Sequence, residues 1–149
     1  MALKERIQED MKTAMRSGDK DRLGVIRMIL AAVKQREVDE RIALDDNQVL
    51  SVLEKMVKQR RESIAQFTTG GRNDLVTRET AELQVVEGYL PQRMGEAELD
   101  ALIAEAIAST GAASIKDMGK VMAAVKAKAT GRADMGAVSA RIKQQLSPA

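Results

Sequence analysis

Two helical patterns meet in residues 117–143, which read DMGKVMAAVKAKATGRADMGAVSARIK. When each residue advances a helix by 100°, each pattern gathers its apolar side chains on one face. The first face holds Met118, Val121, Met122, Val125 and Ala129, and the second holds Met135, Val138, Ile142 and Leu146. Gly131 favours a left-handed end for the first helix, and Asp134 can cap the second by accepting hydrogen bonds from its free N–H groups. The stretch therefore predicts a tightly turned helical hairpin.

Caps and chain breakers divide the rest of the sequence into further helices. The predicted helices span residues 3–16, 20–39, 46–68, 74–90, 96–109, 115–129 and 134–146. Pro91 and the residues after it mark a boundary between two groups of helices. We therefore expect an all-α fold, with an N-terminal helical bundle of about four helices in residues 1–92 and a three-helix C-terminal unit in residues 93–149.

The helical wheels also predict details of packing. Met15 falls on the apolar face of the first helix, and residues 24–33 of the second are apolar nearly all round, so the second helix should be central. Ser114 is placed to cap the helix that follows it. Gly119 and Gly136 lack a side chain, which lets another backbone approach, so we expect close helix packing at both positions.

The composition of the 149 residues limits both fold and chemistry. Phe67 and Tyr89 are the only aromatic residues, so the core must be built from aliphatic side chains and methionine, as in a helical protein. The sequence has no cysteine and no histidine, which excludes disulfides and thiol chemistry and fits a reducing compartment. It shows neither a signal peptide nor a membrane-spanning run, so we expect a cytoplasmic protein with no membrane partner.

The net charge of +2 is unevenly distributed. Residues 1–90 hold 16 basic and 16 acidic side chains, residues 91–115 have a net charge of −3, and residues 116–149 hold seven basic against two acidic side chains. The seven are Lys116, Lys120, Lys126, Lys128, Arg132, Arg141 and Lys143. Such a cluster can meet several phosphates of a nucleic acid, and it is also typical of a solvated face whose cations lie near a helix C-terminus.

Arg60 and Arg27 break the apolar pattern of the N-terminal half. Arg60 lies about 20° from Val49 around the third helix, and Arg27 interrupts the most hydrophobic segment. A cation in such a place needs a carboxylate or must extend out to solvent. One interpretation is that these arginines lock helix packing through Glu79, Glu82 or Glu37. The other is a groove for an anionic ligand lined by Lys58, Arg60, Arg61 and Arg72.

Several short motifs recur in an order that resembles a known family. They are residues 58–67 (KQRRESIAQF), 71–75 (GRNDL), 79–83 (ETAEL), 89–91 (YLP), 118–122 (MGKVM) and 131–134 (GRAD). The sequence resembles the YqeY family over nearly its whole length. It also resembles the related tail domain of the B subunit of glutamine-dependent aspartyl/glutamyl-tRNA amidotransferase.

The resemblance implies an accessory role rather than intrinsic catalysis. In the amidotransferase, the amidase chemistry belongs to another subunit, and ATP activation belongs to a catalytic domain that precedes the tail. The chain has no glycine-rich phosphate loop and no cysteine or histidine nucleophile. We therefore expect no catalytic residue, no cofactor and no metal site. A polar loop that caps a helix accounts for the clustered acids Asp39, Glu40, Asp45 and Asp46.

With this resemblance, the seven basic residues predict binding to tRNA or to a tRNA-bearing complex. The chain lacks an exposed aromatic platform for stacking unpaired bases, so it should recognise backbone and shape. Amidotransferase subunits are the other partners that the resemblance implies. Two alternatives stay open: a component with carbon–nitrogen ligase activity that uses glutamine as amido-N-donor only with other subunits, and a helical protein-interaction module without RNA.

Overall fold

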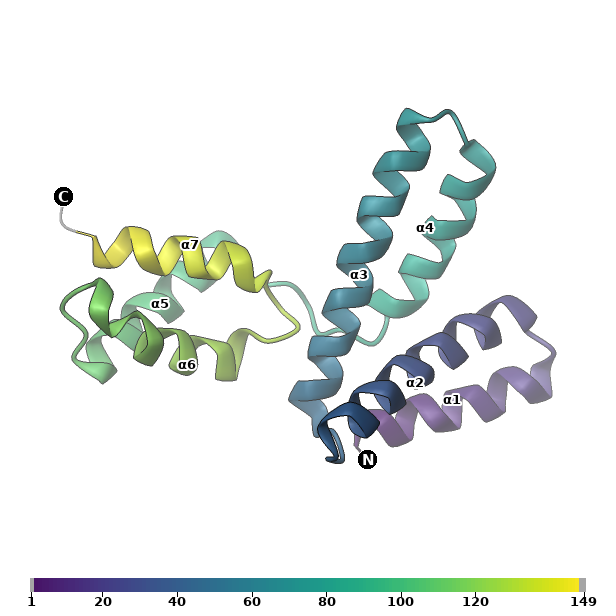
Figure 1. Cartoon of the computed structure of the whole chain (residues 1–149), viewed down its shortest axis with the longest axis horizontal. Helices are drawn as coiled ribbons and strands as arrows, with labels where there is room; N and C mark the ends of the chain where they lie inside the picture. The colour runs from purple at the N-terminus through teal and green to yellow at the C-terminus, as the bar shows by residue number, and fades with distance from the viewer. Residues whose placement is uncertain (1, 148–149) are drawn as a thin grey trace. The chain divides into compact units, whose positions relative to one another are not determined.

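The computed structural model describes residues 2–147, which form α-helices joined by short turns (Figure 1). These residues contain seven α-helices, one short 3-10 turn and no strand, so the predicted all-α fold is confirmed. The chain forms two compact units, residues 1–90 and 91–149. Each unit has its own hydrophobic core.

The first unit consists of two helical hairpins. It comprises α1 (Leu3–Ser17), α2 (Lys20–Glu40), α3 (Asp46–Thr69) and α4 (Asn73–Glu87). Gly18 ends α1 with a φ of 72°, and Asp19 then accepts a hydrogen bond from the Arg22 N–H to start α2. Asp45 starts α3 in a reciprocal capping box with Gln48. These local signals separate the helices as the sequence predicts.

The core of the first unit lies between α2 and its three neighbours. Its largest fully buried side chains are Ile7, Ile26, Ile29, Val33, Val49, Leu53 and Val86. Helix α2 contacts α1, α3 and α4, which agrees with its predicted central place. One side of α2 is nevertheless open to solvent, where Gly24, Arg27, Met28 and Ala31 are exposed.

Two predicted details of the first unit were wrong. Met15 is 53% exposed. It lies about 80° from Ile7 around α1, so it falls outside the narrow face that packs on the core. Helix α4 ends at Glu87, three residues before the predicted end. The chain turns there because Tyr89 enters the core and is only 4% exposed.

The two halves of α3 are held in different ways. Every buried residue of α3 lies in its first half, namely Val49, Val52, Leu53 and Val57. Further along the helix, Arg60 bridges to Glu79 and Glu82 of α4. The far part of the α3–α4 hairpin therefore depends on ion pairs as well as on half-buried apolar contacts.

The second unit is a three-helix cluster. It comprises α5 (Glu96–Thr110), the turn η1 (Ile115–Asp117), α6 (Met118–Ala129) and α7 (Met135–Leu146). Its core includes Leu99, Ile103, Val121, Val125, Val138, Ile142 and Leu146. Gly131 has a φ of 79°, and Asp134 accepts a hydrogen bond from the Gly136 N–H at 3.3 Å. The predicted α6–α7 hairpin is therefore confirmed.

The predictions about Ser114, Gly119 and Gly136 were wrong. Ser114 makes no capping hydrogen bond, and Asp117 instead accepts a bond from the Ala113 N–H at 3.0 Å. Apart from its own helix, no described atom lies within 4 Å of the point where a Cβ on Gly119 would sit. Gly136 meets only the Asp134 carboxylate, at 3.7 Å. No other helix packs closely on either glycine, because both face away from the core of the unit.

Candidate nucleic-acid interface

The outer side of α6 carries small residues between two lysines. Gly119, Ala123 and Ala127 recur at every fourth position and are all exposed. Lys120 lies at one edge of this row and Lys126 at the other, about 120° apart around the helix. We call these five residues the α6 face. Because its centre has no long side chain, a ligand can approach the helix backbone between the two ammonium groups.

Four of the seven basic residues predicted to bind nucleic acid are open to solvent. Lys116, Lys120, Lys126 and Lys143 are exposed, and none of them forms an ion pair with another residue in the part of the chain that the structure describes. Lys116 lies in η1, just before α6, whereas Lys143 lies in the last turn of α7. Most of the open positive charge of the second unit therefore comes from η1 and α6.

The other three predicted residues pair with carboxylates of α5. The pairs are Lys128 with Glu105 at 3.9 Å, Arg132 with Glu98 at 3.0 Å, and Arg141 with Asp100 at 2.6 Å and with Glu96 at 3.2 Å. Arg132 also donates from Nε to the Gln92 carbonyl at 2.9 Å. These three cations connect elements within the second unit. The cluster of seven seen in the sequence thus divides into four open and three paired residues.

Two pKa shifts in the second unit reflect these contacts. The pKa of Arg141 is raised, first by its hydrogen bond to Asp100 and then by the charge of that carboxylate. The pKa of Asp117 is lowered, chiefly because its carboxylate accepts the Ala113 N–H, and the nearby charge of Lys120 lowers it further. Asp117 is therefore ionised at neutral pH. It places one negative charge beside the α6 face, and that charge is engaged in holding the turn before α6.

Carboxylates also occupy most of the second predicted site, the anion groove. The pairs are Arg60 with Glu79 and Glu82, Arg61 with Glu87, and Arg72 with Asp74. Arg60 is the most buried of these arginines, with 12% of its side chain exposed, whereas Lys58 is exposed to solvent. This arrangement supports the interpretation that Arg60 locks helix packing. Arg27 instead extends to solvent, because it lies on the open side of α2.

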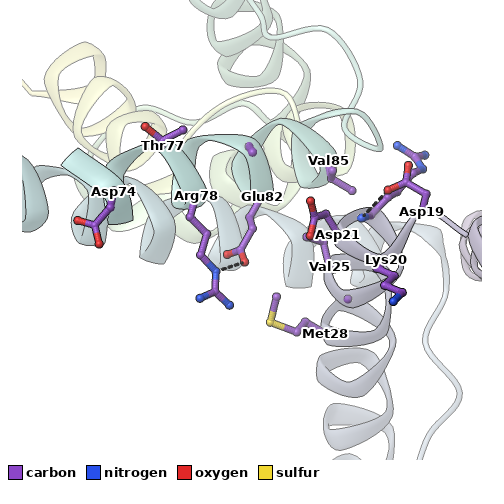
Figure 2. Close-up of a pocket in the computed structure, with 13 residues that line it drawn as sticks. Asp19, Lys20, Asp21, Val25, Met28, Asp74, Thr77, Arg78, Glu82 and Val85 are labelled. Carbon is purple, nitrogen blue, oxygen red and sulfur yellow. Dashed lines mark hydrogen bonds and ion pairs between the residues drawn. The ribbon is translucent and has the colours of Figure 1, made fainter. Parts of the chain in front are cut away.

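A hollow between α2 and α4 was not predicted (Figure 2). Its volume is about 840 Å³, and its apolar lining consists of Gly24, Val25, Met28, Ala81 and Val85. Figure 2 shows Arg78 paired with Glu82 on α4, so these two charges are engaged with each other. The lining residues are far apart in sequence, and only the packing of α2 on α4 brings them together.

The acidic residues near the α2–α3 turn act as caps and ion-pair partners. Asp45 belongs to the capping box of α3, Asp46 accepts a hydrogen bond from the Leu3 N–H at 2.9 Å, and Glu40 pairs with Arg36. In residues 2–147, no three Asp, Glu, His or Cys side chains are grouped so that they could hold a metal ion. No helix in that range is both long enough and apolar enough to cross a membrane.

Comparison with known proteins gives the family of the chain. A family model described as Yqey-like protein matches residues 4–146. The chain belongs to the YqeY-like family. This match confirms the resemblance that the sequence motifs carry, from the α3–α4 hairpin to the α6–α7 hairpin.

Two proteins similar to this YqeY-like protein share one name, "Altered inheritance of mitochondria protein 41, mitochondrial". The protein from Pyrenophora tritici-repentis is 34% identical over 144 residues, which cover 93% of this chain and 78% of the relative. The protein from Lachancea thermotolerans is 32% identical over 147 residues, which cover 94% of this chain and 79% of the relative.

The names of these relatives contradict the predicted cytoplasmic location, because they describe mitochondrial proteins. The prediction rested on the absence of cysteine and of a signal peptide. A composition without cysteine separates reducing from oxidising surroundings, but it does not separate one reducing compartment from another.

Proposed function

We propose that this YqeY-like protein is an RNA-binding accessory protein whose α6 face contacts the phosphate backbone of folded tRNA. The observation that carries the proposal is the open state of the α6 face. Lys120 and Lys126 make no ion pair with any described residue, and nothing described covers the small residues between them. Cations that are free in the folded protein can replace the counterions of a phosphate backbone.

The spacing of the α6 face suits a phosphate backbone. Lys120 and Lys126 are six residues apart, which corresponds to about 9 Å along the helix axis. Ammonium groups at the two edges of the row can each meet a phosphate, while Gly119 and Ala123 let the backbone come close to the helix. Lys116 extends the same positive surface beyond the start of α6.

The aromatic residues favour recognition of backbone and shape over recognition of bases. Tyr89 is buried in the core of the first unit, and Phe67 is half-buried on α3. Neither can serve as an open platform for an unpaired base. A structured RNA with a regular phosphate surface is therefore the best match, and the resemblance to the amidotransferase tail domain is the reason for choosing tRNA.

Binding of the full chain to folded tRNA, measured by fluorescence anisotropy over a salt series, tests the proposal. The variant Lys120→Glu with Lys126→Glu should bind about tenfold more weakly at low salt. Because two phosphate contacts are lost, the slope of log affinity against log salt should also become about 1.5 less steep. The matched control is Arg27→Glu with Lys34→Glu, which makes the same charge change at exposed positions of α2.

The α2 control shows whether tRNA affinity is lost because the α6 face is changed or because the net charge of the protein is lowered. If both variants lose affinity equally, binding follows net charge alone and the α6 face is not the site. If the unmodified chain does not bind tRNA even at low salt, where electrostatic attraction is least screened, the proposal fails altogether.

A further inference from the structure

A row of exposed residues runs along α2 on the side away from the core. Every seventh residue is basic, and a small or aliphatic residue lies between each pair of cations. The row consists of Lys20, Gly24, Arg27, Ala31, Lys34, Val38 and Arg41. All seven residues are exposed. We call this row the α2 stripe. It ends at Arg41, the residue that caps the C-terminus of α2.

The stripe is straight because its residues alternate in steps of four and three. Such steps keep all seven positions within about 100° of arc on a helix. Successive cations lie about 10.5 Å apart along the axis, and the whole row is about 31 Å long. The buried residues Val25, Ile29 and Val33 lie on the opposite side of α2, so the stripe takes no part in the core.

Acidic groups lie beside the stripe but do not pair with its cations. None of its four cations forms an ion pair within residues 2–147. Asp19 and Asp21 flank Lys20, and Asp19 accepts the Arg22 N–H as the cap of α2. Glu37, whose charge interacts with that of Lys34, is bonded to Lys4 Nζ and to the Leu44 N–H, each at 2.9 Å. Its pKa is lowered chiefly by the hydrogen bond from Lys4. Asp39 lies farther round the helix and accepts a bond from Gln35.

Exposed apolar side chains accompany the cations. The described residues include five large hydrophobic side chains that are exposed, and three of these belong to or follow α2: Met28 at 41%, Val38 at 59% and Ile42 at 42%. Met28 and Lys20 both line the 840 Å³ hollow beside α4, which lies along the first part of the stripe (Figure 2). Val38 and Ile42 line a second hollow of about 350 Å³ at the other end.

We propose that the α2 stripe is a docking surface for an acidic amphipathic helix of a partner protein. A partner helix with Asp or Glu at every seventh position matches the spacing of the four cations. Gly24 and Ala31 allow the two helix axes to approach closely. Aliphatic side chains of the partner would enter the hollows at the two ends. A phosphate backbone offers no such apolar groups, so the exposed aliphatic residues favour a protein partner over nucleic acid.

This surface is separate from the α6 face and does not depend on the proposed RNA contact. The charge pairs would set orientation and speed of association, whereas the apolar contacts would supply most of the affinity. The partner is identified here by its chemistry: a helix with acids in a seven-residue repeat on one side and aliphatic residues beside them.

The test uses the full chain and two synthetic helical peptides of equal composition. In the periodic peptide, Glu occupies every seventh position with Leu between the glutamates; in the scrambled peptide, the same residues have no period. Fluorescence anisotropy should give at least tenfold tighter binding for the periodic peptide. The variant Arg27→Glu with Lys34→Glu should weaken that binding at least tenfold, while Lys120→Glu with Lys126→Glu should leave it within twofold.

A third variant tests whether the partner helix must approach α2 closely, without changing any charge. Ala31→Gln keeps the charge and the helix but places a longer side chain in the middle of the stripe. It should weaken the periodic peptide several-fold. Because Arg27, Ala31 and Lys34 are exposed, circular dichroism should show unchanged helix content in these variants.

Several outcomes would overturn the proposal. If the two peptides bind equally, the stripe does not recognise the seven-residue spacing of acids. The same conclusion follows if the Arg27 and Lys34 double variant binds the periodic peptide as tightly as the unmodified chain. Failure of the periodic peptide to bind at low salt would also overturn the proposal. If that double variant loses tRNA binding while the periodic peptide does not bind, the stripe is a nucleic-acid surface instead.

Discussion

The basic segment of the second unit, residues 116–149, has a large positive net charge, but several of its cations are paired with acids. The α2 stripe lies in a unit with no net charge, yet its cations are all open. Residues 116–149 hold seven cations against two acids, whereas residues 1–90 are neutral. Yet α5 supplies carboxylates to three of those seven cations, and all four cations of the stripe stay unpaired among the described residues. Net charge along a sequence therefore does not show which cations remain free after helices pack.

The difference also separates two roles of basic residues. A cation bonded to carboxylates on a neighbouring helix contributes to the fold, as Arg60 and Arg132 do. A cation without a partner contributes little to stability and is free to meet a ligand. Substitutions of paired residues should therefore lower stability, whereas substitutions of open residues should lower binding and leave stability unchanged.

The largest effect on stability is expected at Arg60. Arg60→Ala leaves Glu79 and Glu82 close together without the guanidinium that joins them, in a place where their side chains are only 22% and 15% exposed. The free energy of unfolding should fall by about 2 to 3 kcal/mol, because Glu79 is left half-buried without a cation and Glu82 keeps only its longer pair with the exposed Arg78. Urea unfolding followed by circular dichroism measures this change.

The neighbouring Arg61 provides the matched control for Arg60. Its pair with Glu87 is exposed, at 54% and 40% of the two side chains, so Arg61→Ala should change the free energy of unfolding by no more than about 0.5 kcal/mol. Equal losses at both positions would contradict the distinction between buried and exposed pairs within the same hairpin.

The next largest effect is expected at Tyr89, which ties the end of the first unit to α1. Its hydroxyl donates a hydrogen bond to Asp10 at 2.6 Å, and the Arg6 guanidinium lies 5.2 Å from the centre of its ring. Tyr89→Phe removes the hydrogen bond but keeps the ring. The free energy of unfolding should fall by about 1.5 kcal/mol at neutral pH.

This tyrosine also predicts a dependence on alkaline pH. Burial, and then the bond to Asp10, raise the pKa of Tyr89 to about 12, above its usual value near 10. The unfolded chain therefore loses the phenolic proton first, so the stabilising effect of Tyr89 is complete below pH 10 and declines as the pH rises toward 12. The stability difference between the unmodified chain and Tyr89→Phe should shrink in that range. A difference that stays constant up to pH 12 would contradict the raised pKa.

Most of the fold could be predicted from local signals in the sequence. The start of α3 depends on Asp45 and Gln48, and the turn before α7 depends on Gly131 and Asp134. Within each pair, the two residues are three positions apart in the sequence. Such signals place helix ends to within a few residues. The end of α4 was missed because it depends on Tyr89 packing into the core, which is a contact with distant residues.

The candidate sites could be predicted only in part. Whether a basic side chain is paired or open to a ligand depends on neighbours that only the fold brings together. The seven basic residues of the second unit were found by composition, but their division into open and paired residues depends on α5 packing against α6 and α7. The α2 stripe was missed because the segment around Val25 and Ile29 reads as apolar nearly all round. Its repeat of seven is visible in the sequence once the exposed side of the helix is known.

A smaller effect, of opposite sign, is expected at the two exposed helical glycines. A Cβ at Gly119 or at Gly24 would meet no described atom within 4 Å outside its own helix and immediate neighbours. Gly119→Ala and Gly24→Ala should each raise the free energy of unfolding by about 0.5 to 1 kcal/mol, since alanine favours helix. Thermal unfolding of each variant measures this gain, and a loss of stability would show that the backbone is approached more closely than the structure indicates.

A small effect on binding should come from freeing paired cations of the second unit. Glu98→Gln with Asp100→Asn removes two carboxylates of α5 that pair with Arg132 and Arg141. If those carboxylates reduce the positive field around the α6 face, the variant should bind folded tRNA about threefold more tightly at low salt. The control is Glu5→Gln with Glu62→Gln, which removes the same charge at exposed positions of the first unit. An equal gain in both variants would mean that RNA affinity follows the total charge. A gain confined to the α5 variant would mean that the local balance between α5 and the basic segment sets that affinity.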